Sequence, residues 1–243
     1  MASTEAAHNS PGAAEELAGY EGAKLGMWLF LATELLLFSV MFAGFAIFHS
    51  LYPNEFKLAH ASLDWKLGGL NTLVLITSSL TVALALDSVQ RGNNKRANMM
   101  LLVTIILAGV FLIVKYFEYT GKFHHGIFPG DKVTQAFSGG KGMQIKLPSG
   151  SYGPVPESIM VGGASVPIQL IGIKLFFSFY FIMTGVHGLH VIIGASVLAV
   201  ILWKNTKNRY SHWYYTPVEN GALYWHLVDL IWIYLFPLFY LIK

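Results

Sequence analysis

The sequence predicts an all-α integral membrane protein, a bundle of five transmembrane helices. Charged residues make up 12% of the chain and hydrophobic residues 54%, whereas a soluble domain normally carries about 25% charged residues. Five apolar segments are also long enough to cross hydrocarbon about 30 Å thick, which takes about 20 helical residues each. The length of 243 residues therefore allows one membrane domain and no sizeable soluble one.

The five spans are expected near residues 24–49, 68–90, 98–121, 170–203 and 216–242. Each span is expected to be helical, since hydrocarbon cannot hydrogen-bond the backbone of an open strand or loop. No convincing internal repeat is visible in the sequence.

The rest of the chain is expected to be irregular. Residues 1–23 are mostly Ala, Glu, Ser and Gly without an apolar core, so they predict a disordered tail and no signal peptide ahead of a membrane domain at 24–243. The connection 122–169 holds nine Gly and five Pro, which exclude a long helix or strand. Within it, residues 143–147 and 151–152 flank a Pro-Ser-Gly turn and are expected to form a small hairpin.

Basic residues in the short loops predict the orientation. The two loops on the side of the N-terminus hold Arg91, Lys95 and Arg96 in one case and Lys204, Lys207 and Arg209 in the other. Because positively charged loops stay in the cytoplasm, we expect a cytoplasmic N-terminus and a periplasmic C-terminus. The formal net charge of +3 is modest and lies in such loops, so no nucleic-acid partner is expected.

The absence of cysteine limits the cofactors that this chain is expected to hold. It excludes disulfides, thioether-attached haem, cysteine-ligated iron–sulfur clusters and a cysteine-bridged copper centre.

Ionisable residues interrupt three of the apolar spans. Such residues are costly in hydrocarbon and are candidates for a functional site. The intramembrane set comprises Glu34, His187, His190, Glu219, His226 and Asp229. Glu34 and His226 each lie ten residues from the predicted inner end of their span, which is about 15 Å at 1.5 Å per residue. We therefore expect these groups to lie near one depth, with the Glu34 carboxyl protonated and hydrogen-bonded to a neighbouring helix.

A secondary polar pair lies near the other end of the third span. Lys115 and Glu118 are three residues apart, so they share a helix face. We expect an ion pair in which the lysine extends to the membrane interface.

The residues alone leave several interpretations of the intramembrane set open. The foremost is structural, in which buried polar side chains link helices at about 0.6 kcal/mol each. Proton or ion traffic is a second use of such groups. A di-metal centre is a third, although the usual Glu-x-x-His pairs are missing. A fourth is a haem with His190 and His226 as axial ligands.

Four segments, in order along the chain, resemble the signature of cytochrome c oxidase subunit III. They are Thr33–Phe38, Glu118–Tyr119, Phe177–Gly194 and Tyr224–Asp229, the last followed by Trp232. The matches extend over roughly residues 24–121 and 170–240.

The resemblance implies a subunit without a catalytic centre in a proton-pumping haem–copper terminal oxidase, a complex that reduces oxygen to water. No cofactor is expected in this chain, while haem and copper are expected in partner subunits I and II. It also implies phospholipid binding, support of proton uptake and a location in the bacterial inner membrane. Glu34 matches the family's carbodiimide-reactive intramembrane carboxylate. The family's buried polar network is matched by His187, His190, His226 and Asp229.

Two features depart from the family pattern. Mitochondrial-type members have seven helices, with a lipid-filled cleft between the first two and the other five, and this chain begins where the third is expected. Either the cleft is therefore expected to be absent, or the missing pair is expected to come from another polypeptide, such as an extended catalytic subunit. The connection 122–169 is longer than in the family, and we expect it to dock on an outer-face partner such as a further respiratory subunit.

Other functions remain open. The same fold serves a quinol oxidase subunit III and the paralogue that accompanies nitric oxide reductases. A stand-alone intramembrane haem or metal protein using His187, His190 and His226 belongs to a different class. A proton-coupled transporter fits poorly, because the sequence shows no repeat and no pair of broken helices.

Overall fold

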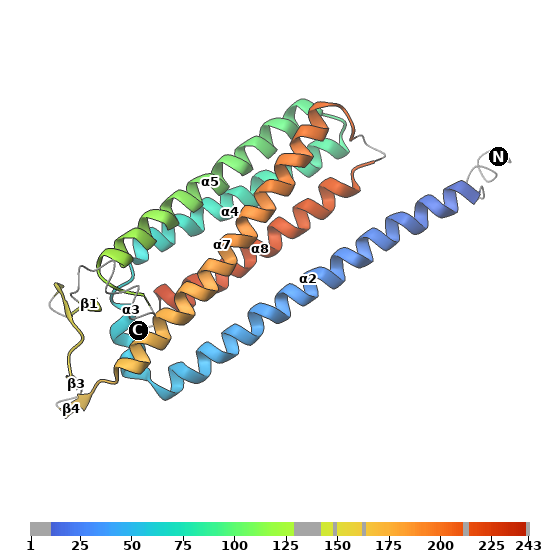
Figure 1. Cartoon of the computed structure of the whole chain (residues 1–243). Coiled ribbons are helices and arrows are strands. Elements are labelled where there is room, and N and C mark those ends of the chain that lie inside the picture. Colours follow the sequence, from blue (N-terminus) through green and yellow to red (C-terminus); the bar gives the residue numbers. More distant parts are fainter. Residues whose placement is uncertain (1–10, 129–141, 148–149, 162–163, 211–213, 242–243) are drawn as a thin grey trace.

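The protein is a bundle of long helices with a small cap at one end (Figure 1). The computed structural model describes residues 11–128, 142–147, 150–161, 164–210 and 214–241. Within these residues, five helices are long and apolar enough to cross a membrane. The predicted fold class, a helical integral membrane protein with five spans, is confirmed.

The five long helices lie over the predicted spans. They are α2 (Pro11–Leu51), α4 (Trp65–Gln90), α5 (Asn94–His124), α7 (Leu170–Thr206) and α8 (Thr216–Tyr240). α4 packs against α5 and α8, and α7 packs against the same two helices, so these four form the bundle. α2 lies along one side of it and packs mainly against α7 and α8 (Figure 1).

The start of α2 corrects the expectation of a disordered tail. The helix begins at Pro11, so residues 11–23 are helical, while residues 1–10 lie outside the described residues. Proline is favoured at the first position of a helix, where its missing N–H has no intrahelical partner. The Ala, Glu and Leu residues that follow have high helix propensity.

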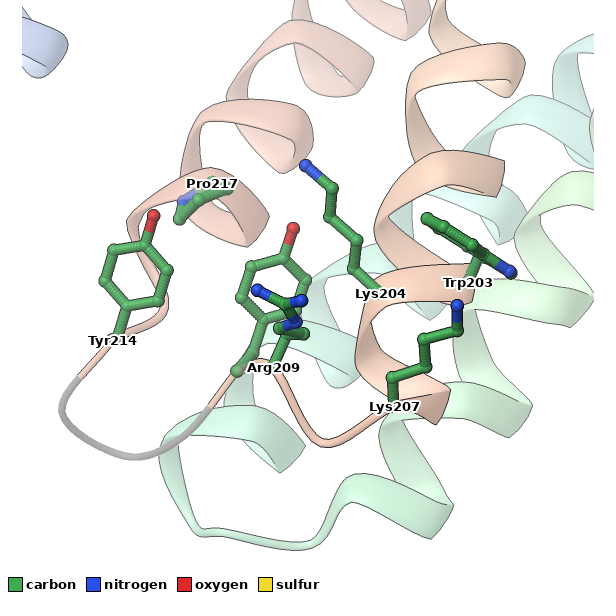
Figure 2. A pocket seen from close by; sticks show the side chains of 7 residues that line it. Trp203, Lys204, Lys207, Arg209, Tyr214 and Pro217 are labelled. Atoms are coloured by element: carbon green, nitrogen blue, oxygen red, sulfur yellow. The ribbon is translucent and has the colours of Figure 1, made fainter.

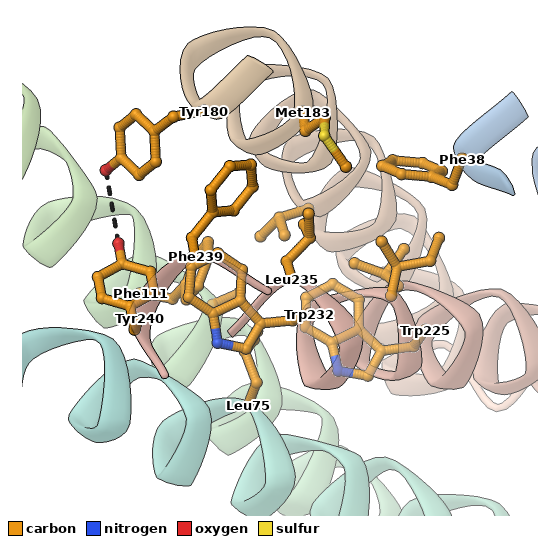
Figure 3. Packing of buried hydrophobic residues seen from close by; sticks show 14 of the residues in the cluster. Phe38, Leu75, Phe111, Tyr180, Met183, Trp225, Trp232, Leu235, Phe239 and Tyr240 are labelled. Atoms are coloured by element: carbon orange, nitrogen blue, oxygen red, sulfur yellow. Dashed lines mark hydrogen bonds between the residues drawn. The ribbon is translucent and has the colours of Figure 1, made fainter. Parts of the chain in front are cut away.

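Aromatic side chains fill the middle of the bundle (Figure 3). Trp232 meets the ring of Phe111 edge-to-face, with centroids 4.9 Å apart. Its indole N–H donates to Thr72 Oγ1 at 3.0 Å, and the indole N–H of Trp225 donates to Ser78 Oγ at 3.1 Å. Because both hydroxyls belong to α4, the two tryptophans of α8 bond the helices as well as filling space between them.

A short helix and two hairpins cap one end of the bundle, called here the hairpin end (Figure 1). β1 (Gln144–Lys146) pairs antiparallel with β2 (Tyr152–Pro154), which confirms the predicted hairpin. β3 (Ser158–Val161) pairs with β4 (Ala164–Pro167) in a second hairpin that was not predicted. The opposite end carries the basic loops after α4 and α7 and is called the basic end.

The short helix α3 (Pro53–His60) holds the cap to the bundle. Glu55 Oε1 accepts the backbone N–H of Gln169 at 3.0 Å, directly before α7 begins. Ser62 Oγ, just beyond α3, accepts the backbone N–H of Lys146 in β1 at 2.9 Å. This segment lies between the first two predicted spans, where the chain was expected to be irregular. Proline at the first helical position was the signal for α3.

Candidate functional site: intramembrane polar groups

The predicted intramembrane residues do not form one cluster, and the first group is a pair between α2 and α7. His190 Nε2 lies 2.9 Å from Glu34 Oε2. His190 Nδ1 lies 2.8 Å from the carbonyl oxygen of Val186, which can only accept, so Nδ1 carries a proton. The ring of Phe38 meets the imidazole edge-on, with centroids 5.7 Å apart. Glu34 is thus bonded to a neighbouring helix, as the sequence-based hypothesis required.

The geometry of this pair limits its protonation states to two. Since Nδ1 donates, the bond at Nε2 joins either an imidazolium to a carboxylate or a neutral imidazole to a protonated carboxyl. Either way, one proton is shared between Glu34 and His190. The shared proton can therefore move between the carboxyl and the imidazole inside the membrane without changing the net charge of the pair.

The second group lies between α4 and α8. His226 Nδ1 lies 2.7 Å from Ser79 Oγ, which links the two helices. Asp229, one turn further along α8 and 3% exposed, lies beside Ser79. Both of its carboxylate oxygens lack a hydrogen-bond partner among the described residues. These two residues share a helix face, as predicted, but they do not contact the Glu34–His190 pair.

Two other members of the predicted set lie apart from these groups. Glu219 is in the first turn of α8 at the basic end, where it forms an ion pair with Lys24 at 3.0 Å. His187 is fully buried between Phe111 and Trp232, with ring centroids at 5.6 and 5.2 Å. Neither ring nitrogen of His187 has a hydrogen-bond partner within the described part of the chain.

The secondary pair proves to be the centre of a buried charge cluster at the hairpin end. Lys115 Nζ donates to Glu118 Oε2 at 2.9 Å, and Lys122 Nζ donates to Oε1 at 3.0 Å. The hydroxyls of Tyr180 and Tyr240 also donate to Oε1, at 2.8 and 2.6 Å. One carboxylate from α5 thereby holds two lysines of its own helix and one tyrosine each from α7 and α8.

Lys115 does not extend to the interface as expected. Its ammonium group is buried and lies 4.8 Å from the ring centroid of Trp232 and 5.2 Å from that of Tyr180. Aromatic faces attract a cation and replace part of its hydration. Two local signals pointed to the larger cluster: Lys122 is four residues after Glu118, and Tyr180 lies on the polar face of the fourth span. The role of Tyr240 depends on tertiary packing and had no local signal.

The intramembrane polar side chains therefore lie in separate parts of the bundle and do not form one site. Among the described residues, no three His, Asp or Glu side chains are grouped closely enough to hold a metal ion. The two histidines of the His-x-x-His segment have different surroundings, because His190 is bonded to α2 while His187 is buried against α5 and α8.

A basic pocket of about 360 Å³ lies at the basic end, between the end of α7 and the start of α8 (Figure 2). It is lined by Trp203, Lys204, Lys207, Arg209, Tyr210, Tyr214 and Pro217. Lys207 Nζ lies 3.7 Å above the ring of Trp203. An apolar groove of about 490 Å³ shares Lys204, Tyr210 and Pro217 with this pocket and continues along α7 to Ile192.

Comparison with known proteins places this arrangement in a family. The sequence profile of cytochrome c oxidase subunit III matches residues 6–127 and 168–243. The chain belongs to the cytochrome c oxidase subunit III family. The match has a gap at residues 128–167, which include both hairpins.

Individual members show how far the similarity extends. Cytochrome c oxidase subunit 3 of Trichophyton rubrum is 30% identical, over 90% of this chain and 67% of that protein. The protein of the same name from Emericella nidulans is 29% identical over 89% of this chain and 66% of its own length. That from the cyanobacterium Synechocystis is 26% identical over 96% of this chain and 82% of its own length. The chain thus spans about two thirds of the length of the fungal relatives.

Proposed function

We propose that this chain is the non-catalytic subunit III of a haem–copper terminal oxidase in a bacterial inner membrane. The observation that supports it best is the family match to all five spans, on both sides of the hairpin cap. In this proposal, subunits I and II carry the haem and copper and reduce oxygen to water, and this chain binds to them. The basic end faces the cytoplasm, in keeping with its arginines and lysines.

The Glu34–His190 pair is the proposed contribution of this chain to proton uptake. Glu34 lies ten residues from Lys24, which forms an ion pair at the basic end, a rise of about 15 Å along the helix. The proton already shared by the pair can move between imidazole and carboxyl with no change in net charge, so a proton that arrives on one side can be matched by one that leaves on the other. The pair also joins α2 to α7, so loss of either partner is expected to loosen α2.

The basic pocket and its groove support the proposal that the chain binds an anionic phospholipid. Lys204 points into the space between α7 and α8 in Figure 2, and the pocket lies at the ends of these two helices. Cationic pockets between transmembrane helices on the cytoplasmic side are typical headgroup sites. The apolar groove that continues along α7 has room for part of an acyl chain.

The test of the main proposal is purification of the tagged chain from its native membrane in mild detergent. We expect a haem-bearing subunit to co-purify, and every haem band in the reduced-minus-oxidised spectrum to leave with that subunit when it is stripped away. A stripped chain that retains a haem band or a stoichiometric metal would contradict the proposal and favour an independent cofactor protein. Copper in the co-purified subunit II distinguishes a cytochrome c oxidase from a quinol oxidase.

A further inference from the structure

The two hairpins of the cap differ in how the outer edge of their first strand is covered. In β1, the amides of Gln144 and Lys146 point away from β2, since an antiparallel ladder bonds every second residue. Both outward amides have acceptors in this chain. Gln144 N–H donates to the carbonyl oxygen of His125 at 3.0 Å, and Lys146 N–H donates to Ser62 Oγ at 2.9 Å. The chain therefore covers the edge of β1 itself.

The outer edge of β3 lacks this cover. The carbonyl oxygen of Glu157 accepts the N–H of Ile168 at 2.8 Å, so this is a hydrogen-bonded pair of the second hairpin. Alternation along the ladder makes Ile159 the next residue bonded to β4, and it turns the N–H and C=O groups of Ser158 and Met160 away from β4. No hydrogen bond to these four groups occurs among the described residues. Both residues are exposed, Met160 by 73%.

The opposite edge of the second hairpin is blocked. The outward residues of β4 are Ser165 and Pro167, which lie directly opposite Met160 and Ser158. Pro167 has no N–H, and proline is a common means of preventing a further strand from pairing at an edge. β3, in contrast, contains neither proline nor a charged residue. The hairpin therefore has one edge suited to pairing, the edge of β3.

The second hairpin is also incomplete as a sheet. Two strands alone are at best marginally stable in water, and a third strand adds to their stability. One face of the hairpin is packed, since Ile159 lies against the core. The other face exposes Met160 and Ser165. Figure 1 shows β3 and β4 beyond the ends of the helices, at the edge of the molecule, where another chain has access to them.

We propose that an extended segment of another subunit of the oxidase adds a third strand to the edge of β3. Its backbone bonds the outward groups of Ser158 and Met160, as in other cases of strand addition to an exposed edge. The inference rests on the proposed function. An edge four residues long buries less surface than an independent interface needs, which is about 1,000 Å². It contributes when the two chains are already held together, and the membrane spans of one complex do this. This favours a subunit of the same complex over a second copy of this chain.

The first test is hydrogen exchange at single-residue resolution, in the purified complex and in the purified chain alone. We expect the amides of Ser158 and Met160 to exchange about tenfold more slowly in the complex, as for amides that gain a hydrogen bond. The amide of Ser165, which points from the opposite edge, is expected to exchange equally in both samples. Equal exchange of the Ser158 and Met160 amides in both samples overturns the inference and leaves the proposed function standing.

Two proline variants distinguish the edge of β3 from the hairpin as a whole. Met160→Pro removes an outward N–H from β3, and Ser165→Pro removes the one directly opposite on β4. Neither variant removes a hydrogen bond between the two strands, because both amides point away from the hairpin. The amide of Ile159, which is bonded to β4, reports whether the hairpin still forms. We expect Met160→Pro alone to return the Ser158 amide in the complex to its exchange rate in the isolated chain. An equal effect of Ser165→Pro overturns the inference.

A photochemical cross-link identifies the occupant of the edge. The probe is the complex in which the exposed Ser158 is replaced by the photoreactive residue benzoylphenylalanine, illuminated in native membranes. We expect a product that joins this chain to another oxidase subunit, identified by peptide mass spectrometry. A product that joins two copies of this chain overturns the inference. If the wild-type chain never co-purifies with oxidase subunits, the proposed function fails, and the inference fails with it.

Discussion

Replacement of Glu118 by glutamine is the sharpest test of how the hairpin end is held together. The substitution removes one negative charge and keeps nearly the same volume. Four donors point at the present carboxylate: the ammonium groups of Lys115 and Lys122 at 2.9 and 3.0 Å, and the hydroxyls of Tyr180 and Tyr240 at 2.8 and 2.6 Å. In Glu118→Gln, two buried ammonium groups face each other without a counter-charge.

The expected loss of stability is large. Breaking a buried ion pair by removing one partner destabilises a protein by about 3–5 kcal/mol, because the remaining charge stays buried and uncompensated. Two cations lose their partner here, so we expect at least about 3 kcal/mol. The rings of Trp232 and Tyr180 near Lys115 offset part of this, by about 0.5–2 kcal/mol.

The assay is reversible unfolding of the purified chain in mixed micelles, followed by helical circular dichroism. Asp87→Asn is the control for removing one charge, because it breaks the exposed pair with Arg91, which is expected to contribute at most about 1 kcal/mol. A triple variant that also replaces Lys115 and Lys122 by methionine removes the stranded charges, and we expect it to recover most of the loss.

The reasoning is refuted if Glu118→Gln costs no more than the exposed control. It is equally refuted if the triple variant is less stable than Glu118→Gln. In that case the lysines would be stabilised by surroundings other than the carboxylate, and the cluster would not be an ion-pair unit.

Three further predictions concern other parts of the molecule. Gly68→Ala would place a methyl group 2.9 Å from a tyrosine ring and is expected to destabilise by about 1–3 kcal/mol, whereas Gly69→Ala, with its nearest neighbour at 3.9 Å, is expected to be neutral or stabilising in the same unfolding assay. A hydrophobic carbodiimide is expected to label Glu34 in intact membranes, measured by peptide mass spectrometry with Glu34→Gln as the blank; absence of labelling would show that the carboxyl is ionised. Burial and the neighbouring His124 lower the pKa of His125 from its ordinary 6.5. The neutral imidazole packs on the ring of Tyr152, with centroids 3.8 Å apart. We therefore expect this contact to stabilise β1–β2 fully above pH 6.5, and the stabilisation to be lost as the pH falls below 6.5 and through the lowered pKa. Hydrogen exchange of the β1–β2 amides, corrected for its intrinsic pH dependence and compared with His125→Phe, measures this effect.

The helical spans could be predicted because each depends on its own segment alone. A run of about 20 apolar residues must form a helix in hydrocarbon whatever surrounds it. The hairpin β1–β2 also had a local signal in its turn residues. The segment Pro53–His60 was missed because it is too short and too polar for hydropathy to distinguish it from a loop.

The polar groups could be recognised one by one, but their partners could not be assigned. Equal depth along the spans made Glu34, His190 and His226 candidates for one cluster. Which of them meet depends on how the helices are arranged around the bundle axis, and no single span carries that information. α2 lies against α7, so Glu34 meets His190, while His226 faces Ser79 on α4.

The position of α2 has a consequence for how the chain is made. Of the five spans described here, α2 leaves the ribosome before the others, while its packing partners α7 and α8 leave it after them. Glu34 and His190 are 156 residues apart, which takes about 8–30 s to synthesise at 5–20 residues per second. During that interval the imidazole does not yet exist, and a carboxylate alone in hydrocarbon is costly. The contact between Glu34 and His190, and with it this link between α2 and α7, can therefore form only after the fourth span has been synthesised.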